Sequence, residues 1–417
     1  MAGKRKIIFH IDVNSAYLSW EAVDRLQHGA SLDIRTIPAV IGGNPEKRHG
    51  IVLAKSIPAK KYQIKTGETL YAARLKCPDL AIFPPRYDLY IRCSEAMLEL
   101  LREYSPHIQR YSIDEVFLDY THMEEHFGDP IEAAHQIKDR IHGELGFTVN
   151  IGISTNKLLA KMASDFSKPN KVHTLFPAEV PEKLWPLPVE ELFMVGRATA
   201  PKLHRFGIYT IGDLARADPD LLKKRLKSHG LLIWNYANGR EDSPVGDLPG
   251  IKSVGNSSTI AFDVEDRKTA HMFLLSLSEM VGMRLRNAGY LAQLVAVSLK
   301  TKDFFSYSHQ RKLYTATDAT NQIYGAAASL FDEMWQGEPL RAIGVRAGAL
   351  VDGSLQQLSL FDPGNAWKER AMDAAVDKIR NKYGSNMIMR AVFLHSGIRP
   401  LTGGVWEEDY PMMSSIL

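Results

Sequence analysis

Apolar and polar residues alternate in three short segments of the first 170 residues, a pattern typical of β-strands. The segments are KIIFHID at residues 6–12, YSIDEVFLDY at 111–120 and FTVNIGIS at 147–154. Elsewhere the apolar residues recur at helical spacing, which predicts helices at residues 15–23, 94–104, 130–146 and 155–166. Asn14 is the expected N-cap of the first helix. This order of strands and helices predicts one sheet with helices on one face.

The pattern changes beyond about residue 171. Residues 180–226 are helical in character and contain a short glycine-bearing turn, MVGRAT. Strand and helix patterns return between residues 253 and 351, after a basic linker around GIKSVG. A last amphipathic helix is predicted after Asn365 as its cap, with Gly384 as its end. These changes predict a chain of several domains.

Composition narrows the class of protein. A length of 417 residues, with 45% hydrophobic and 24% charged residues, is typical of a soluble globular chain of several domains. The net charge of +3 adds only a mild preference for anionic partners. The two cysteines, Cys77 and Cys93, exclude a disulfide framework and favour a reducing compartment. Because no apolar run is long enough for a membrane helix, we expect a cytoplasmic protein without a membrane partner.

Three carboxylates interrupt two of the predicted strands. Asp12 ends the first strand, and Asp114 and Glu115 stand at the head of the second. An unpaired buried charge is costly, so these groups need water or a compensating cation. If the two strands are neighbours, the carboxylates meet at one end of the sheet and offer the oxygen ligands that Mg²⁺ prefers. Since adjacent residues of a strand point to opposite faces, a turn or bulge must re-aim Asp114 or Glu115.

Two interpretations of the carboxylates stay open from spacing alone. A pair of Mg²⁺ ions about 3.5–4 Å apart clamps the attacking and leaving oxygens in phosphoryl transfer. Alternatively, an adjacent Asp–Glu pair before a strand is a solvated hairpin tip. Asp12, which interrupts a second apolar strand, favours the metal site.

Three longer segments resemble the catalytic core of Y-family translesion DNA polymerases, of the bacterial DNA polymerase IV and UmuC-like kind. They are FHIDVNSAYLSWE, YSIDEVFLD and GISTNKLLAKMASDFSKPN, and the resemblance extends to MVGRAT and to QLSLF near the C-terminus. It implies an α+β multidomain fold: a right-hand polymerase with a ferredoxin-like palm, small fingers, a helical thumb with a helix-hairpin-helix, and an α/β little finger. It also implies a DNA-directed DNA polymerase, a nucleotidyltransferase that copies damaged templates with low fidelity.

The resemblance further implies domain boundaries along the chain. They are residues 1–23 and 87–174 for the palm, 24–86 for the fingers, 175–245 for the thumb, 252–352 for the little finger and 353–417 for a C-terminal tail. The tail would carry the clamp-binding peptide.

The resemblance assigns catalytic roles to the carboxylates. Asp12, Asp114 and Glu115 would hold two Mg²⁺ ions, with the Val13 carbonyl oxygen as a further ligand. The primer 3′-hydroxyl would attack the α-phosphate of the incoming dNTP, and pyrophosphate would leave. His10, on the same strand face as Asp12, is interpreted as a structural histidine.

The resemblance also points to substrate-binding residues. Tyr17 lies where the family places its steric gate, an aromatic side chain that leaves no room for a 2′-hydroxyl. Lys168, in SKPN, matches the lysine that contacts the triphosphate. In the fingers segment, Ile57 and Lys60 occupy positions where the family usually has a tyrosine and an arginine. Because Ile57 cannot hydrogen-bond a phosphate and Lys60 cannot form a bidentate fork, we expect looser nucleotide binding with unchanged chemistry.

Candidate contacts to macromolecules lie further along the chain. Gly196 and Arg197, in the MVGRAT turn, would grip a DNA phosphate through backbone amides, and Lys252 in the basic linker would face the template. QLSLF resembles the peptide that bacterial replication proteins insert into the sliding clamp, and its clamp-binding residues are Gln357, Leu358, Leu360 and Phe361. The expected partners are therefore primer-template DNA, dNTP and the sliding clamp, with the protein itself a monomer.

Two other functions stay open from the residues. A nucleotide cyclase shares a palm-like two-metal site but has no need of MVGRAT or QLSLF. A non-catalytic DNA-binding or clamp-binding accessory protein has no need of all three carboxylates. Primer extension with primed template, Mg²⁺ and dNTPs separates the three possibilities.

Overall fold

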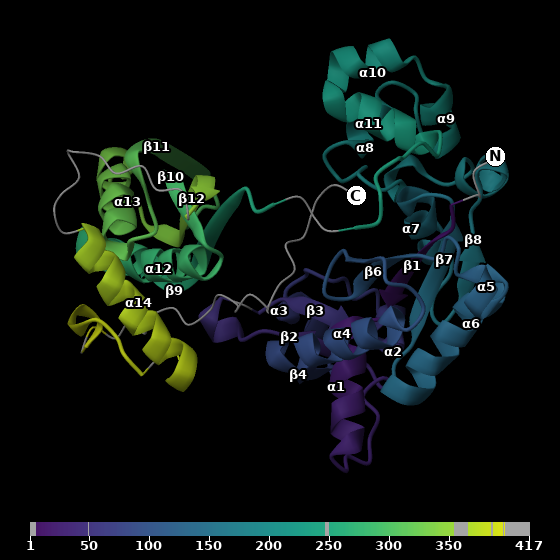
Figure 1. The fold of residues 1–417 in the computed structure, drawn as a ribbon, viewed down its shortest axis with the longest axis horizontal. Coiled ribbons are helices and arrows are strands. Elements are labelled where there is room, and N and C mark those ends of the chain that lie inside the picture. The colour runs from purple at the N-terminus through teal and green to yellow at the C-terminus, as the bar shows by residue number, and fades with distance from the viewer. Residues whose placement is uncertain are drawn as a thin grey trace. The chain divides into compact units, whose positions relative to one another are not determined.

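The computed structural model describes residues 6–48, 50–246, 250–353, 366–384, 387–394 and 396. Within these ranges the chain forms two compact units (Figure 1). The first unit contains the described residues up to 42 and from 51 to 246, and the second contains those from 43 to 50 and from 250 onward. In this described part of the chain, every helix is too short or too polar to span a membrane.

A five-stranded sheet forms the centre of the first unit, with the strand order β5-β6-β1-β7-β8. β1 runs antiparallel to both β6 and β7, whereas β8 is parallel to β7. Every residue of β1 is buried, so this strand lies in the core. The three strands predicted from alternation are β1, β6 and β7, and they are confirmed. The strands are β1 (Ile8–Val13), β5 (Ile108–Arg110), β6 (Glu115–Asp119), β7 (Val149–Ser154) and β8 (Val172–Thr174).

Helices cover both faces of this sheet. Phe9 and Ile11 of β1 share a core with residues of α1, α4 and α6, whereas Ile8 belongs to a second cluster with Ala160 of α7. The prediction of helices on one face only is therefore wrong. The polar side of β1 is itself buried against α7, where His10 Nδ1 lies 2.8 Å from Ser164 Oγ. The helices are α1 (Ala16–Gln27), α4 (Tyr87–Arg102), α5 (Glu124–Phe127), α6 (Pro130–Arg140), which continues into the π-helical turn η2 (Ile141–Leu145), and α7 (Lys157–Asp165).

The N-cap of the first helix is not the residue that the sequence predicted. α1 starts at Ala16, and Ser15 occupies the N-cap position in a left-handed conformation, with no side-chain cap. The prediction of Asn14 as the N-cap is wrong, because its side chain bonds instead to Asn150 and to the amide of Asn170. Tertiary hydrogen bonds have therefore overridden a local capping preference.

A small three-stranded sheet has the strand order β3-β2-β4. It lies within residues 24–86, the range that the resemblance assigns to the fingers, and we call it the fingers sheet. β2 is antiparallel to β3 and parallel to β4. Leu18 and Ala22 of α1 pack against this sheet through Ala39 and Ile41, which joins it to the five-stranded sheet. The elements are β2 (Ala39–Gly42), β3 (Val52–Lys55), α2 (Ile57–Lys61), α3 (Leu70–Lys76) and β4 (Ala81–Phe83).

Short helices with their own apolar core follow the five-stranded sheet. Leu158 and Leu159 of α7 belong to this core, so α7 serves both the sheet and the helical region. The helical character predicted for residues 180–226 is confirmed. The elements are η3 (Pro177–Glu179), η4 (Val180–Leu184), η5 (Val189–Glu191), α8 (Ala200–His204), α9 (Ile211–Arg216), α10 (Pro219–Leu226) and α11 (Ser228–Ala237).

The second unit is built on a four-stranded antiparallel sheet with the order β11-β10-β12-β9. Apolar residues of these strands form one core with α12 and α13. The strand and helix pattern predicted for residues 253–351 is confirmed. The elements are β9 (Ser253–Val264), α12 (Arg267–Asn287), β10 (Tyr290–Thr301), β11 (Ser306–Thr317), α13 (Thr320–Met334) and β12 (Leu340–Asp352), with the short turns η1 (Pro45–Lys47) and η6 (Ala391–Phe393) also in this unit.

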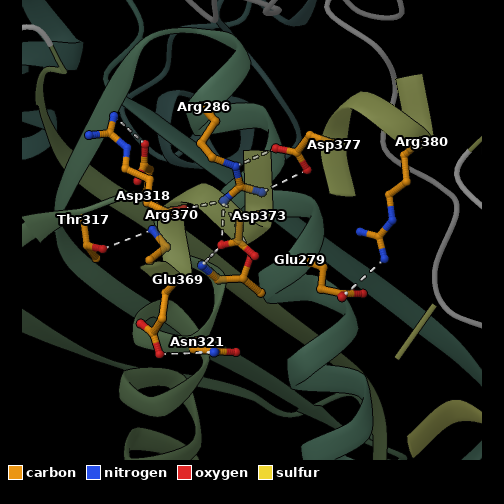
Figure 2. A network of polar contacts seen from close by, with 12 residues as sticks. Glu279, Arg286, Thr317, Asp318, Asn321, Glu369, Arg370, Asp373, Asp377 and Arg380 are labelled. Carbon is orange, nitrogen blue, oxygen red and sulfur yellow. Dashed lines mark hydrogen bonds and ion pairs between the residues drawn. The ribbon is translucent and has the colours of Figure 1, made fainter. Parts of the chain in front are cut away.

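The last helix, α14 (Ala366–Tyr383), docks on α12 and α13 through charged side chains (Figure 2). Arg286 of α12 bonds to Asp377 at 2.6 Å and to Asp373 at 3.2 Å, and all three side chains are about nine-tenths buried. Glu279 accepts a further hydrogen bond from Arg380. The predicted end of this helix at Gly384 is confirmed, since Gly384 adopts a positive φ and its amide bonds to the Arg380 carbonyl. Asn365, the predicted cap, lies outside the described residues.

Candidate active site

The pairing of β1 with β6 brings the three carboxylates together. Asp12 stands directly opposite Glu115 in the antiparallel register. The Val13 amide donates to the Asp114 carbonyl at 3.0 Å, which holds the residue before β6 against the end of β1. Asp12, Asp114 and Glu115 therefore meet at one end of the sheet, although Asp12 is far from the other two in sequence.

A turn ahead of β6 gives Asp114 its orientation. The amides of Tyr111 and Ser112 both donate to the Glu115 carbonyl, at 3.0 and 3.1 Å, so the chain bends before the strand begins. Ser112 Oγ donates to Asp114 Oδ1 at 2.7 Å and fixes the carboxylate. Asp114 consequently lies outside the strand, and the opposite-face rule that applies within a strand does not separate it from Glu115.

Two lysines contact these carboxylates in the structure. Lys168 pairs with Asp12, and Lys161 of α7 lies 2.5 Å from Glu115 Oε1. Lys168 also reaches Asp165 at 2.8 Å. With the side chains in these positions, the described residues contain no group of three His, Cys, Asp or Glu side chains spaced to hold a metal ion. The compensating charges are therefore lysine ammonium groups, and a metal ion would have to compete with them.

The electrostatics of the carboxylates still favour additional positive charge. Burial raises the pKa of Asp12 to about 6, because the attraction of Lys168 offsets the desolvation only in part and Glu115 repels. Burial likewise raises the pKa of Asp114, despite the hydrogen bond from Ser112. The ionised forms are thus under-compensated. Since the donors are hard carboxylate oxygens, this set fits a divalent cation such as Mg²⁺.

His10 lies behind this site and has no solvent contact. Burial lowers its pKa well below the usual value, and the nearby charges of Lys161 and Lys168 lower it further. The ring is therefore neutral, with Nδ1 bonded to Ser164. This supports its interpretation as a structural histidine.

A cavity of about 910 Å³ opens beside the carboxylates, within the first unit. Its volume lies in the range of small-molecule sites. Its lining brings together most of the residues that the sequence suggested for metal and nucleotide, and it adds residues of the fingers sheet. Glu115 is not among the lining residues. Those lining residues include Asp12, Val13, Tyr17, Lys55, Ile57, Lys60, Asp114 and Lys168.

Tyr17 is held in this lining by other aromatic rings. Its ring stacks on Tyr90 with centroids 4.5 Å apart and planes 11° apart. The rings of Trp20 and Tyr87 each lie 6.1 Å away. Because the Tyr17 ring packs against this aromatic cluster, it cannot easily move aside for a ligand with an additional group. A steric gate requires a side chain that is fixed in this way.

The fingers side of the cavity presents lysines. Ile57 is the first residue of α2 and is half exposed, and Lys60 lies in the last turn of that helix. Lys55, at the end of β3, also lines the cavity and was missed by the sequence reasoning. Burial lowers the pKa of Lys55, and the charge of Lys60 lowers it further. Lys55 and Lys60 therefore line the same cavity as Lys168.

Buried polar residues around the site were also missed. Lys157 and Lys161 lie one turn apart on α7 and are both buried, a spacing within an apolar helix that could have signalled a role. Asn150 of β7 stands opposite Asp12 on the other side of β1 and has no exposed surface. In the sequence, Asn150 is distinguished only by being a polar residue within an otherwise apolar strand.

The candidate DNA contacts are not among the residues that line this cavity. The amides of Thr199 and Ala200 donate to the Gly196 carbonyl at 2.8 and 3.0 Å, which starts α8. Gly196 and Arg197 are exposed, and their own amides form no backbone hydrogen bond within the described chain. Lys252 is exposed at the start of the second unit. The predicted clamp-binding residues Gln357, Leu358, Leu360 and Phe361 lie outside the described residues.

Comparison with known proteins decides the family. The sequence matches the impB/mucB/samB family over residues 11–165, the HHH motif of the IMS family over 177–208, and the impB/mucB/samB family C-terminal domain over 251–360. DNA polymerase IV of Clostridium acetobutylicum is 49% identical over 390 residues, which cover 93% of this chain and 98% of that protein. The chain belongs to the impB/mucB/samB family. The resemblance to Y-family polymerases found in the sequence is thereby confirmed.

Solved structures of DNA polymerases show a similar fold. A Y-family DNA polymerase chimera of Dbh and Dpo4 superposes with a TM-score of 0.72 at 24% identity, covering 83% of this chain and 99% of the chimera. An insertion ternary complex of Dbh DNA polymerase superposes with a TM-score of 0.58 at 23% identity, covering 83% and 99% respectively. The predicted α+β multidomain polymerase fold is therefore confirmed.

Proposed function

We propose that Asp12, Asp114 and Glu115 are the metal-binding carboxylates of a translesion DNA polymerase. Membership of the impB/mucB/samB family gives the activity: the chain is a DNA-directed DNA polymerase, a nucleotidyltransferase that depends on divalent metal. The observation that carries the residue assignment is the register of β1 and β6, which puts Asp12 opposite Glu115 and beside Asp114. Two of them, Asp12 and Asp114, line a cavity large enough for a nucleotide.

The metal centre we propose takes two Mg²⁺ ions, held by the three carboxylates and the Val13 carbonyl oxygen. When bound, such ions neutralise phosphate charge and lower the pKa of the attacking primer hydroxyl. The chain contributes the arrangement: Ser112 fixes Asp114, and the β-sheet register fixes Asp12 and Glu115. Lys161 pairs with Glu115 and Lys168 pairs with Asp12, and these two ammonium groups supply part of the compensating positive charge before a substrate arrives.

The nucleotide would lie in the cavity between the carboxylates and the fingers sheet. We assign Tyr17 as the steric gate, since its ring is fixed by stacking on Tyr90 and borders the cavity. Lys168 and Lys60 are assigned to the triphosphate. Lys55 joins them, because it lines the same cavity and offers a phosphate the hydrogen-bond donor that Ile57 lacks.

The same proposal covers the macromolecular partners. Primer-template DNA would bind through the exposed amides near Gly196 and Arg197 and through Lys252, and weaken with salt as counterions are released. Residues 357–361 would bind the sliding clamp. We propose a monomer that works in the cytoplasm, where the free thiols Cys77 and Cys93 would stay reduced.

The two alternative functions are not favoured. The relatives named DNA polymerase IV match nearly the whole chain, including the segments that a nucleotide cyclase does not need. A non-catalytic accessory protein does not need an under-compensated carboxylate cluster beside a cavity, and burying such a cluster costs stability.

Primer extension by Asp114→Asn tests the assignment. The variant keeps the shape of the side chain and removes its charge, so extension should fall by at least about a thousandfold, as expected for the loss of an essential electrostatic group. Binding of primer-template DNA should remain. Asp119→Asn is the matched control, since Asp119 lies at the other end of β6 and bonds to the Thr121 amide. Near-normal extension by Asp114→Asn would remove this carboxylate from the metal centre.

A further inference from the structure

Two buried asparagines grip the segment that carries Lys168. We call residues 167–171 (SKPNK) the Lys168 loop. Asn150 Nδ2 donates to the Ser167 carbonyl at 2.6 Å, and Asn150 Oδ1 accepts from the Lys171 amide at 3.2 Å. Asn14 Oδ1 accepts from the Asn170 amide at 2.9 Å. Three backbone groups of a five-residue loop are therefore bound by two side chains.

The two asparagines also bind each other and the end of α7. Asn14 Nδ2 donates to Asn150 Oδ1 at 3.2 Å, and Asn150 Nδ2 donates to the Ser164 carbonyl at 2.9 Å. Both donor hydrogens and both acceptor positions of Asn150 are thus used. A flipped amide would set its oxygen against two carbonyls, so this orientation is the one that the network allows. Aspartate lacks the donors, and no apolar side chain replaces the four bonds.

The fold places Asn150 where it can reach both the catalytic strand and the loop. It lies opposite Asp12 in the register of β1 with β7, and it is fully buried. α7 approaches β7 closely at Gly152, where a Cβ atom would stand 1.9 Å from the Ala160 carbonyl oxygen and 2.5 Å from the Ser164 amide. Only glycine permits this approach, and it brings the Ser164 carbonyl within reach of Asn150.

Besides the asparagines, contacts of the Ser167 and Lys168 side chains hold the loop. Ser167 Oγ lies 2.8 Å from His173 Nε2, and Lys168 pairs with Asp12 and, at 2.8 Å, with Asp165. One sheet bond, from the Ile151 amide to the Lys171 carbonyl at 2.9 Å, ties its end to β7. Asn170 adopts a left-handed φ of 60°, a conformation that asparagine tolerates better than most residues but does not prefer. The position of Lys168 in the middle of this loop, beside Asp12 and the cavity, therefore depends on its side-chain supports.

We propose that Asn150, assisted by Asn14, is a positioning residue for nucleotide binding. The pair holds the Lys168 loop so that the Lys168 ammonium points into the cavity, where it meets the triphosphate of the incoming dNTP. This inference rests on the role proposed above for Lys168. Asn150 itself is too deeply buried to touch the substrate, so its effect on the reaction passes through the loop.

The test compares Asn150→Ala with a matched control, Asn156→Ala. Asn156 lies at the other end of α7, where its side chain accepts from the Leu159 amide and donates to the Gly239 carbonyl, both at 2.8 Å. Each substitution removes the side-chain hydrogen bonds of one asparagine, but only the first releases the loop. In steady-state primer extension, Asn150→Ala should raise the KM for dNTP about tenfold with a smaller change in kcat, and Asn156→Ala should leave KM near normal.

A double-mutant cycle with Lys168→Ala tests whether Asn150 affects the KM for dNTP through Lys168. If Asn150 acts through Lys168, Asn150→Ala should change KM little in the Lys168→Ala background. Additive effects of the two substitutions on KM would overturn the proposal. If Lys168→Ala alone leaves KM unchanged, the proposed role of Lys168 fails, which is a separate result.

Hydrogen–deuterium exchange tests the structural step without catalysis. In Asn150→Ala, the amides of Asn170 and Lys171 should exchange at least tenfold faster than in the parent protein. The exchange rates of the amides in α7 and β7 should not change. Unchanged exchange of these amides in a folded variant would overturn the proposal. Should Asn150→Ala not fold, Asn14→Ala, which removes only the bonds to Asn170 and Asn150, should give the same selective increase at Asn170, and an unchanged rate there would be equally decisive.

Discussion

Replacing Lys161 with methionine tests whether the lysines and a divalent cation compete for the same carboxylates. Lys161 Nζ lies 2.5 Å from Glu115 Oε1, with 10% of the lysine side chain and 22% of the glutamate side chain exposed. The ammonium group also lies over the rings of Tyr111 and Phe193. Methionine preserves the length and apolar packing of the stem and removes the charge.

The expected cost follows from the burial of the pair. Removing one partner of a fully buried ion pair typically costs about 3–5 kcal/mol, because the other charge is left uncompensated. Glu115 retains some contact with water, so we expect about 2–3 kcal/mol in the absence of divalent metal, below that range. Adding Mg²⁺ should restore much of this loss, since the ion then meets a free carboxylate and stabilises the folded state by mass action.

Lys157→Met is the matched control. Lys157 lies one turn earlier on the same buried face of α7, but its Nζ donates to the neutral Gln109 at 3.1 Å. Burial lowers the pKa of Lys157, so this lysine is held at a cost and its replacement should be close to neutral or stabilising. Its stability should show no greater dependence on Mg²⁺ than that of the parent protein.

Thermal unfolding with and without saturating MgCl₂ measures the difference. We expect Lys161→Met to lose stability without metal and to gain more from Mg²⁺ than the parent protein or Lys157→Met. If all three proteins respond equally to Mg²⁺, Lys161 and the ion do not share Glu115, and the account of the carboxylates is refuted.

Three further predictions concern the gate, the last helix and the clamp peptide. Tyr17→Ala should reduce the preference for dNTP over rNTP at least about tenfold, measured as the ratio of kcat/KM values, because the ring that would clash with a 2′-hydroxyl is gone; an unchanged ratio argues against the gate. Arg286→Met should weaken the docking of α14 by about 3–5 kcal/mol, since Asp373 and Asp377 lose their cation, and faster hydrogen exchange throughout α14 would report it. Deleting residues 357–361 should abolish stimulation of synthesis by a purified sliding clamp and leave unstimulated synthesis intact; persistent stimulation would place clamp binding elsewhere.

Local patterns predicted the elements around the site well. β1, β6 and β7 each follow an alternating apolar pattern, and short runs of this kind stand out in a sequence. Asp12 and the Asp114–Glu115 pair are conspicuous because charge interrupts those runs. Their meeting in one place depends on the pairing of β1 with β6, which alternation alone does not define.

Contacts between distant residues account for what the sequence did not reveal. Lys161 and Asn150 take their roles from partners on other elements, so neither is distinguished by its immediate neighbours. Asn14 has a strong local preference for a helix cap, yet its side chain bonds instead to Asn150 and to the amide of Asn170, both distant in sequence. The docking of α14 is a similar case. In the sequence, Arg286, Asp373 and Asp377 have the character of solvated surface charges, and only the fold brings them into contact (Figure 2).

The most direct test of the account is the structure of this protein with primer-template DNA, an incoming dNTP and Mn²⁺, with the ions located by anomalous scattering. The account predicts two ions bound by carboxylate oxygens of Asp12, Asp114 and Glu115, with the Lys168 ammonium moved from Asp12 to the triphosphate. Ions bound elsewhere, or Lys168 still paired with Asp12 beside a bound dNTP, would contradict it.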